Sequence, residues 1–199
     1  MSNKNYMNEN SNEDNINLKL RLTSENHTIY DLAYILVDIN QLLIISKLTE
    51  LEYFDKINHY FLEGRFLTRD SSIMKFSDKY EIVDIKKNCI ELVISGMSLT
   101  ATVIFGIVNL YLKRSERIKN EKNEKIFFSI DKDIFDKVSN IINEHHEINE
   151  LNNLDGLIKK LRLYGYFTDI KERDFFIITE SIEKTVKRMV KIVYPNRKP

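Results

Sequence analysis

The densest group of potential metal ligands in the chain is Glu144-His145-His146-Glu147. Imidazole and carboxylate groups are zinc-ligand types, but adjacent histidines do not converge on one ion as a pair four residues apart on a helix would. His146 and Glu150 have that spacing, which is a weak match that requires this polar stretch to be helical. We therefore interpret the stretch as a surface connection and predict no metal site.

Signatures of catalysis are also missing from the sequence. There is no GxSxG, GxxxxGK or GxGxxG motif, and the five glycines are scattered singly. The single cysteine, Cys89, opens a β-rich run, where a buried and inert thiol is the usual state. The carboxylates of Asp131 and Asp133 fall at a helix-cap position. We predict a non-enzymatic protein without a cofactor.

The longest uncharged segment runs from Leu92 to Leu112 and has 21 residues, and about 20 suffice to cross a bilayer as a helix. Its first residues, up to Ser98, have the composition of a strand and a turn, which leaves about 14 residues for a helix. That length is more typical of a buried core helix. The sequence leaves two possibilities open for helix 98–112, burial in a core or oligomer seam and insertion into a membrane.

Small and polar residues form one stripe on this helix. Ser98, Thr102, Gly106 and Asn109 recur at helical spacing. Such a stripe lets helices approach closely, in water or in lipid. We predict that these four residues line a seam, or even a pore, in a homo-oligomer.

Basic residues follow the apolar helix and recur near the C-terminus, although 30 Lys and Arg balance 30 Asp and Glu over the whole chain. Zero net charge argues against a generally basic, nucleic-acid-coating protein. Local clusters can nevertheless meet anionic lipid or phosphates. The predicted basic flank comprises Lys113, Arg114, Arg117, Lys184, Lys187, Arg188 and Lys191.

The elements that would position these residues can be read from periodicity. Residues 1–15 are polar and predict a disordered tail. Thr28 and Asp31 have the spacing of a capping box at a helix start, and Thr49 and Glu52 repeat it. The other predicted elements before residue 126 are strand 17–23, a hairpin of 80–85 and 89–95, and helix 98–112 with a charged extension. We expect residues 16–125 to form an assembly or sensing domain.

Residues 126–199 predict a C-terminal unit rich in helices. Helices are expected from Asp131 and over 154–164, and 181–194 closes the chain as a basic helix. Between them, 166–170 and 175–179 predict a second hairpin. The predicted fold class is α+β, with a small sheet (strand plus hairpin) packed with helices around a central apolar helix, followed by this unit.

Two loose resemblances add to this interpretation. Around Ser95-Gly96-Met97-Ser98-Leu99, residues 80–120 resemble small bacterial proteins of unassigned role, in which a hairpin leads through a Gly-x-Ser-like turn into a long apolar helix. This resemblance implies a bacterial accessory or defence-type component. LIKKLRLYGYF and a hairpin ending in IITES, within residues 131–194, resemble the second half of a winged-helix domain, which implies DNA binding.

Our leading prediction is a non-enzymatic, oligomeric accessory or effector protein, with membrane activity through helix 98–112 as one version, for example in anti-phage defence. The alternative is a winged-helix DNA-binding regulator that uses residues 154–198. A homo-oligomer is the expected partner, and an anionic membrane, a nucleic acid or a nucleotide ligand remain open. One cysteine and no apolar signal-peptide core predict a cytoplasmic protein, or one attached to the inner membrane from the cytoplasmic side.

Overall fold

A computed structural model describes residues 16–23, 28–63, 80–86, 89–119, 126–129, 136, 140, 154–163 and 165–193. The predicted tail, 1–15, and the Glu144–Glu147 group lie outside the described residues. Most of the helix predicted from Asp131 lies outside them too.

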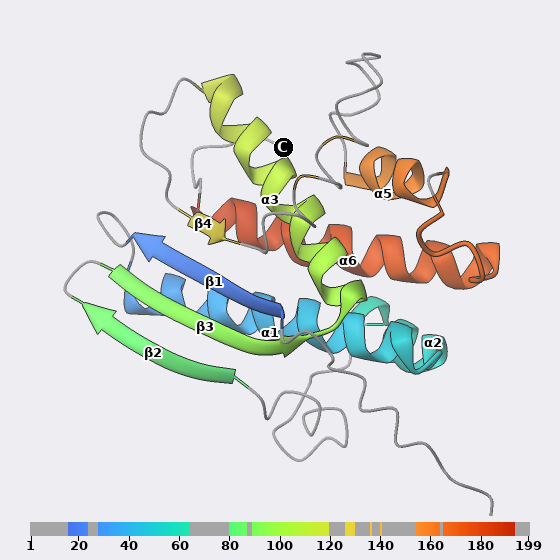
Figure 1. Ribbon diagram of the computed structural model, residues 1–199, viewed down its shortest axis with the longest axis horizontal. Helices are drawn as coiled ribbons and strands as arrows, with labels where there is room; N and C mark the ends of the chain where they lie inside the picture. Colours follow the sequence, from blue (N-terminus) through green and yellow to red (C-terminus); the bar gives the residue numbers. More distant parts are fainter. Residues whose placement is uncertain are drawn as a thin grey trace, which may run out of the picture.

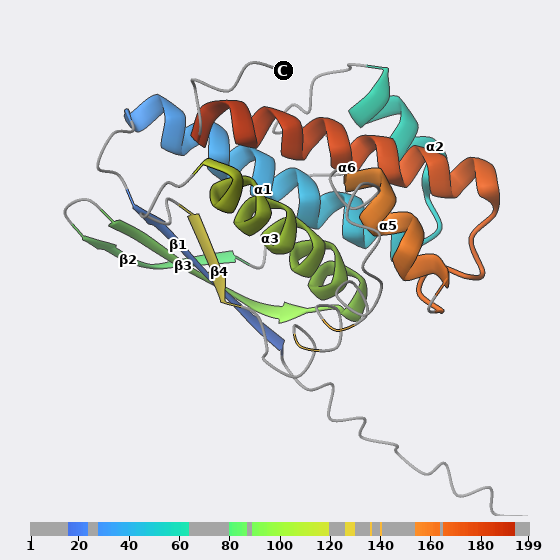
Figure 2. The same cartoon turned by 90° about the horizontal axis from the view of Figure 1, so that it is seen from above.

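In the described part, four helices form one body: α1 (Ile29–Glu50), α3 (Leu99–Lys119), α5 (Leu154–Leu163) and α6 (Glu172–Val193). Helices α1 and α6 lie side by side and run in opposite directions, and α3 packs against α1 (Figures 1 and 2). A short helix, α2 (Phe54–Ile57), continues into the π-helical turn η1 (Asn58–Leu62), and both contact α6.

Helix α1 begins where the sequence predicts. The Asp31 amide donates to Thr28 Oγ1 at 3.2 Å, and the Thr28 amide donates to Asp31 Oδ2 at 2.8 Å, which confirms the capping box. The second capping box is wrong, because α1 continues through Thr49, whose buried hydroxyl donates to Ile45 O at 2.8 Å. The chain leaves α1 at Leu51, and Glu52 then has a positive φ of 57°.

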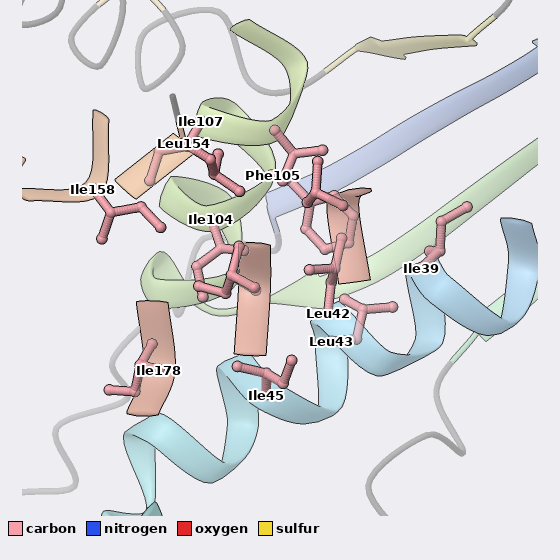
Figure 3. Close-up of a cluster of buried hydrophobic side chains, with 14 of the residues drawn as sticks. Ile39, Leu42, Leu43, Ile45, Ile104, Phe105, Ile107, Leu154, Ile158 and Ile178 are labelled. Atoms are coloured by element: carbon pink, nitrogen blue, oxygen red, sulfur yellow. The ribbon is translucent and has the colours of Figure 1, made fainter. Parts of the chain in front are cut away.

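One hydrophobic core joins the helices, and α3 contributes a continuous buried run, 101–110 (Figure 3). Phe105 of α3 is fully buried beside Leu42 of α1. Full burial of one such side chain contributes about 1.5–3 kcal/mol, so α3 is a main source of stability. The labelled core residues in Figure 3 are Ile39, Leu42, Leu43, Ile45, Ile104, Phe105, Ile107, Leu154, Ile158 and Ile178.

Strands lie to one side of this body, in the antiparallel order β2-β3-β1-β4 (Figure 2). Leu20 of β1 pairs with Leu92 of β3 on one side and with Phe128 of β4 on the other. Strand β3 leads directly into α3, so it anchors the start of that helix. The bounds are β1 Ile16–Thr23, β2 Tyr80–Lys86, β3 Cys89–Met97 and β4 Ile126–Ser129.

The predicted α+β fold class is wrong. In the part of the chain whose side chains are described, the four helices account for the structure, and Ile94 is the one strand residue whose burial is described. The sequence prediction gave a sheet the role of a core layer because alternating apolar residues are typical of half-buried strands. In the described part of the structure, packing between helices buries the apolar side chains of α1, α3, α5 and α6.

The predicted second hairpin is also wrong. Residues 165–170 are turns, in which Gly165 has a φ of 93°, and residues 175–179 belong to α6. The Phe-Phe-Ile-Ile-Thr run has strong β propensity, but its apolar residues continue a stripe of helical period that a core can bury. The buried stripe consists of Phe175, Ile178, Ile182, Val186 and Met189.

The predicted boundary between residues 125 and 126 stays a prediction. Helix α6, from the predicted C-terminal unit, packs along α1, and both contribute to the same core. Arg162 also ties α5 to the start of α6, because it donates to Ile170 O at 2.7 Å and pairs with Glu172 Oε2 at 2.5 Å.

Candidate docking site

The four residues of the predicted seam lie on α3 and at its N-terminus. Ser98 is half-buried and caps the helix, because its Oγ accepts from the Ala101 amide at 3.2 Å. Thr102 is fully buried and donates to Ser98 O at 2.9 Å, and Gly106 and Asn109 are buried too. A second copy could not reach the buried positions unless the helix body opened. The seam or pore therefore stays a prediction that this placement does not favour.

The first three residues of the predicted basic flank, Lys113, Arg114 and Arg117, lie on the last turns of α3. The placement of their side chains is outside the described part of the structure. The other four residues of the flank are on α6 and have described side chains.

Three of the four flank cations on α6 are engaged within the chain. Lys184 Nζ donates to Phe61 O at 3.0 Å and to Leu62 O at 3.3 Å, which satisfies carbonyls at the end of η1. Lys187 Nζ lies 2.8 Å from Glu183 Oε1, and this hydrogen bond raises the pKa of Lys187. Arg188 pairs with α1, and Lys191 is exposed. Most of the flank cations whose side chains are described are thus neutralised or used locally.

The outer face of α1 carries large exposed apolar side chains, although the helix is apolar on nearly all sides. Tyr30 is 75% exposed, Tyr34 59% and Val37 50%. With exposed Ala33 they follow the spacing i, i+3, i+4 and i+7, which places them on one face. We call Tyr30, Ala33, Tyr34 and Val37 the α1 stripe. Neighbouring large apolar residues of α1, such as Ile35 and Leu42, are fully buried.

Where the α1 stripe ends, a buried carboxylate meets an arginine. Arg188 Nε donates to Asp38 Oδ1 at 2.6 Å, and Arg188 Nη2 donates both to the same oxygen and, at 2.5 Å, to Gln41 Oε1. Asp38 is fully buried, whereas the Arg188 side chain is 42% exposed. We call Asp38, Gln41 and Arg188 the Asp38 cluster.

The electrostatics of the Asp38 cluster are dominated by burial. Burial raises the pKa of Asp38 above its ordinary value of 3.8, while the hydrogen bond and the charge of Arg188 oppose that rise. Asp38 Oδ2 has no hydrogen-bond partner among the described residues, so only one carboxylate oxygen is compensated. The Asp38 cluster therefore contains an ion pair, but burying its carboxylate away from water costs free energy.

These two features were not predicted from the sequence. The sequence assigned Arg188 to a contact with lipid or phosphate. One signal was available for the ion pair, because Asp38 interrupts an apolar helix and a buried carboxylate needs a partner. The tyrosines of the α1 stripe gave a weaker signal, since nothing in the sequence tells which face of an all-round apolar helix stays uncovered.

The chemistry that this arrangement can perform is binding. Within the described residues, no group of three or more His, Cys, Asp or Glu side chains gathers to hold a metal ion. The Asp38 carboxylate is buried against a guanidinium, and its printed contacts are to Arg188. The α1 stripe, by contrast, is an exposed apolar surface of the kind that docking sites present.

Helix α1 is also the one described helix with the length and composition to cross a membrane. Its apolar window lies near the N-terminus, and 56% of it is buried inside the protein. The segment that first suggested a membrane span is shorter, since its apolar helical part covers Thr100–Leu112. Length and composition alone allow α1 to be a core helix or a span.

No protein-family model matches the chain, and no curated protein or solved structure does either.

Proposed function

We propose that this chain is a non-enzymatic accessory or effector protein that acts by assembling with itself, and that the contact is the α1 stripe of one copy against that of another. The observation that carries the proposal is the exposure of Tyr30, Tyr34 and Val37 in a row on an otherwise apolar helix. An apolar face of a helix is normally covered, so this exposed row is the place where we expect a partner.

The geometry of the stripe suits a symmetric contact between copies. Residues at i, i+4 and i+7 form a straight ridge along a helix, and two such ridges can pack across a two-fold axis. Asp31, next to Tyr30 in the chain, is bound in the capping box with Thr28, and Arg188, at the other end of the ridge, is paired with Asp38. A second copy would therefore bring apolar surface against apolar surface without burying an unpaired charge.

The charges around the stripe favour a second copy over an anionic partner. Of the α6 cations, Lys187 and Arg188 are paired with carboxylates, and the whole chain has no net charge. Anionic lipid and nucleic acid are held by clusters of uncompensated cations. The hairpin that a winged helix requires is also missing here, because residues 175–179 belong to α6.

The size of the stripe sets the expected strength of assembly. An aromatic side chain presents about 150–250 Å², so the exposed parts of two tyrosines and a valine amount to roughly 300–400 Å² per copy. A standard stable interface buries about 800 Å² per partner. We therefore expect a dimer that depends on protein concentration, in which side chains beside the stripe complete the contact.

We propose a cytoplasmic location for this assembly. More than half of the apolar window of α1 is buried in the helix body, and Asp38 in its middle is paired with Arg188. Inserting α1 into lipid would break that pair and expose the core of the other helices, which is costly. A role in bacterial defence, and a nucleotide ligand, stay predictions from the sequence.

The test is the mass of the protein in solution over a concentration series, by analytical ultracentrifugation. Wild type should shift from monomer to dimer, and Tyr34→Glu should remain monomeric because two charges would meet in the contact. Phe176→Glu is the matched control, since Phe176 is an exposed aromatic residue (62%) on α6, outside the stripe. It should dimerise like wild type.

Two outcomes would overturn the proposal. The first is a wild type that stays monomeric at the highest concentration that remains in solution. The second is sedimentation with anionic vesicles that Tyr34→Glu abolishes, because the stripe would then face lipid.

A further inference from the structure

We propose that acid dissociates this dimer and that the Asp38 cluster is the pH-sensitive element. The inference rests on the proposed function, because it concerns regulation of the same contact. It follows from the position of the cluster on the edge of the α1 stripe, from the burial of Asp38 and from the partial exposure of Arg188.

The first step is the position of Arg188. Gln41 lies four residues after Val37 and thus continues the line of the α1 stripe by one turn. Its Oε1 accepts a hydrogen bond from Arg188 Nη2, which draws the guanidinium from α6 to the end of the stripe. A second copy that packs on the stripe would cover part of the 42% of this side chain that is exposed.

The second step is the cost of removing water from Arg188. While Asp38 is ionised, the guanidinium is neutralised by a carboxylate in direct contact, so it can lose water at a modest cost. When Asp38 takes a proton, the same guanidinium enters the contact as an unpaired charge, which is expensive. Docking therefore favours the ionised carboxylate, and by linkage protonation of the carboxylate favours the separate copies.

The third step is the range of pH in which this occurs. Burial raises the pKa of Asp38 above 3.8, so its titration lies above that of an exposed aspartate. Docking favours the ionised carboxyl in each copy, so the two protons of a dimer act together, and we expect acid to weaken assembly on the order of tenfold. The effect should develop as pH falls from neutral into the acid range.

Other charged groups around α1 are further from the contact or already paired. On α6, Lys187 is paired with Glu183, and Lys191 lies one turn beyond Arg188. The part of α3 that faces α1, residues 99–112, contains no charged residue. The remaining described groups on α1, α2 and η1 are Asp31, Lys47, Glu50, Asp55, Lys56, His59 and Glu63. Lys47 pairs with Glu50, and His59 pairs with Glu63. All four residues follow Gln41 in the chain, on the side away from the α1 stripe.

The experiment measures the dimer dissociation constant at about pH 7.5 and about pH 4.5, with circular dichroism to verify the fold at each pH. Wild type should dimerise about tenfold more weakly in acid. Asp38→Asn imitates the protonated carboxyl, so it should dimerise as weakly at both pH values as wild type does in acid. The double variant Asp38→Leu, Arg188→Leu carries no charge at the cluster, so it should dimerise at both pH values without a pH response.

The outcomes separate this inference from the proposed function. A wild-type dimer of equal strength at both pH values overturns this inference alone. A double variant that keeps the full pH response, or that fails to dimerise while folded, also overturns it. A wild type that is monomeric at both pH values overturns the proposed function, and this inference with it.

Discussion

Removal of Arg188 isolates a carboxylate in the middle of the protein, so the substitution Arg188→Leu should destabilise the fold in a pH-dependent way. Asp38 is fully buried, and Arg188 is the cation that contacts it among the described residues. An ionised carboxylate without a partner costs several kcal/mol in such a site. The variant can avoid that cost only by keeping Asp38 protonated.

The cost of keeping Asp38 protonated sets a ceiling on the loss of stability. In the unfolded chain the carboxyl ionises with a pKa of 3.8, and each pH unit above that value adds 1.36 kcal/mol to the cost of the proton. The ceiling is about 4 kcal/mol at about pH 7 and about 2 kcal/mol at about pH 5. The measured loss should be smaller, because burial already raises the pKa of Asp38 in the intact protein.

The direction in which stability changes with pH follows from the same linkage between protonation and folding. A folded-state pKa above 3.8 means that the folded protein holds its proton more tightly than the unfolded chain does. The contribution of this group to stability is therefore fully present below about pH 3.8 and is lost as pH rises through the folded-state pKa. Since Arg188→Leu raises that pKa further, the variant should approach wild-type stability in acid.

The assay is urea unfolding of wild type and variant at about pH 5 and about pH 7, at a protein concentration where both are monomeric. The double variant Asp38→Leu, Arg188→Leu is the control. It removes both charges and should lose much less than Arg188→Leu alone at about pH 7. An equal loss for Arg188→Leu at both pH values would refute the reasoning. A double variant that loses at least as much as the single one would refute it too.

Two further predictions concern the helices themselves. Thr28→Ala removes the side-chain cap of α1 and should lower the free energy of unfolding by about 1 kcal/mol, measured by urea unfolding. A loss near zero would show that the Thr28 hydrogen bond does not stabilise the helix. Phe105→Ala leaves a cavity in the core and should lower the free energy of unfolding by about 3–5 kcal/mol. Phe176→Ala, at an exposed position, should change it by no more than about 0.5 kcal/mol. Similar losses for the two variants would contradict the burial of α3.

Features that depend on neighbouring residues could be predicted from the sequence. The spacing of Thr28 and Asp31 identified the start of α1, and the helix predicted from residue 98 begins at Leu99 as α3, with Ser98 as its cap. Both are local, because a cap needs only an oxygen and an amide a few residues away. Residues 175–179 were wrongly predicted to be a strand for a local reason as well. Their β propensity was strong, and tertiary packing along α1 overrode it.

The candidate site could not be predicted in the same way, because it depends on contacts between distant parts of the chain. Asp38 and Arg188 are separated by 150 residues, and only the antiparallel packing of α1 on α6 brings them together. Exposure of Tyr34 likewise depends on which face of α1 the helices α3 and α6 leave open. Neither relation is encoded in the spacing of residues within one helix.

The two most apolar helices therefore have different roles, and this separation can be measured. Residues 101–110 lack charge because the fold encloses them, and the hydroxyl of Thr102 bonds to its own helix, as a buried hydroxyl should. Helix α1 has the longer apolar window but leaves Tyr30, Tyr34 and Val37 in water, which adds nothing to the stability of a single copy. It follows that Phe105→Ala should lower the stability of the monomer, whereas Tyr34→Glu should leave monomer stability almost unchanged and abolish the dimer. A Tyr34→Glu variant that unfolds as readily as Phe105→Ala would show that the stripe belongs to the core, and the case for a docking surface on α1 would then fail.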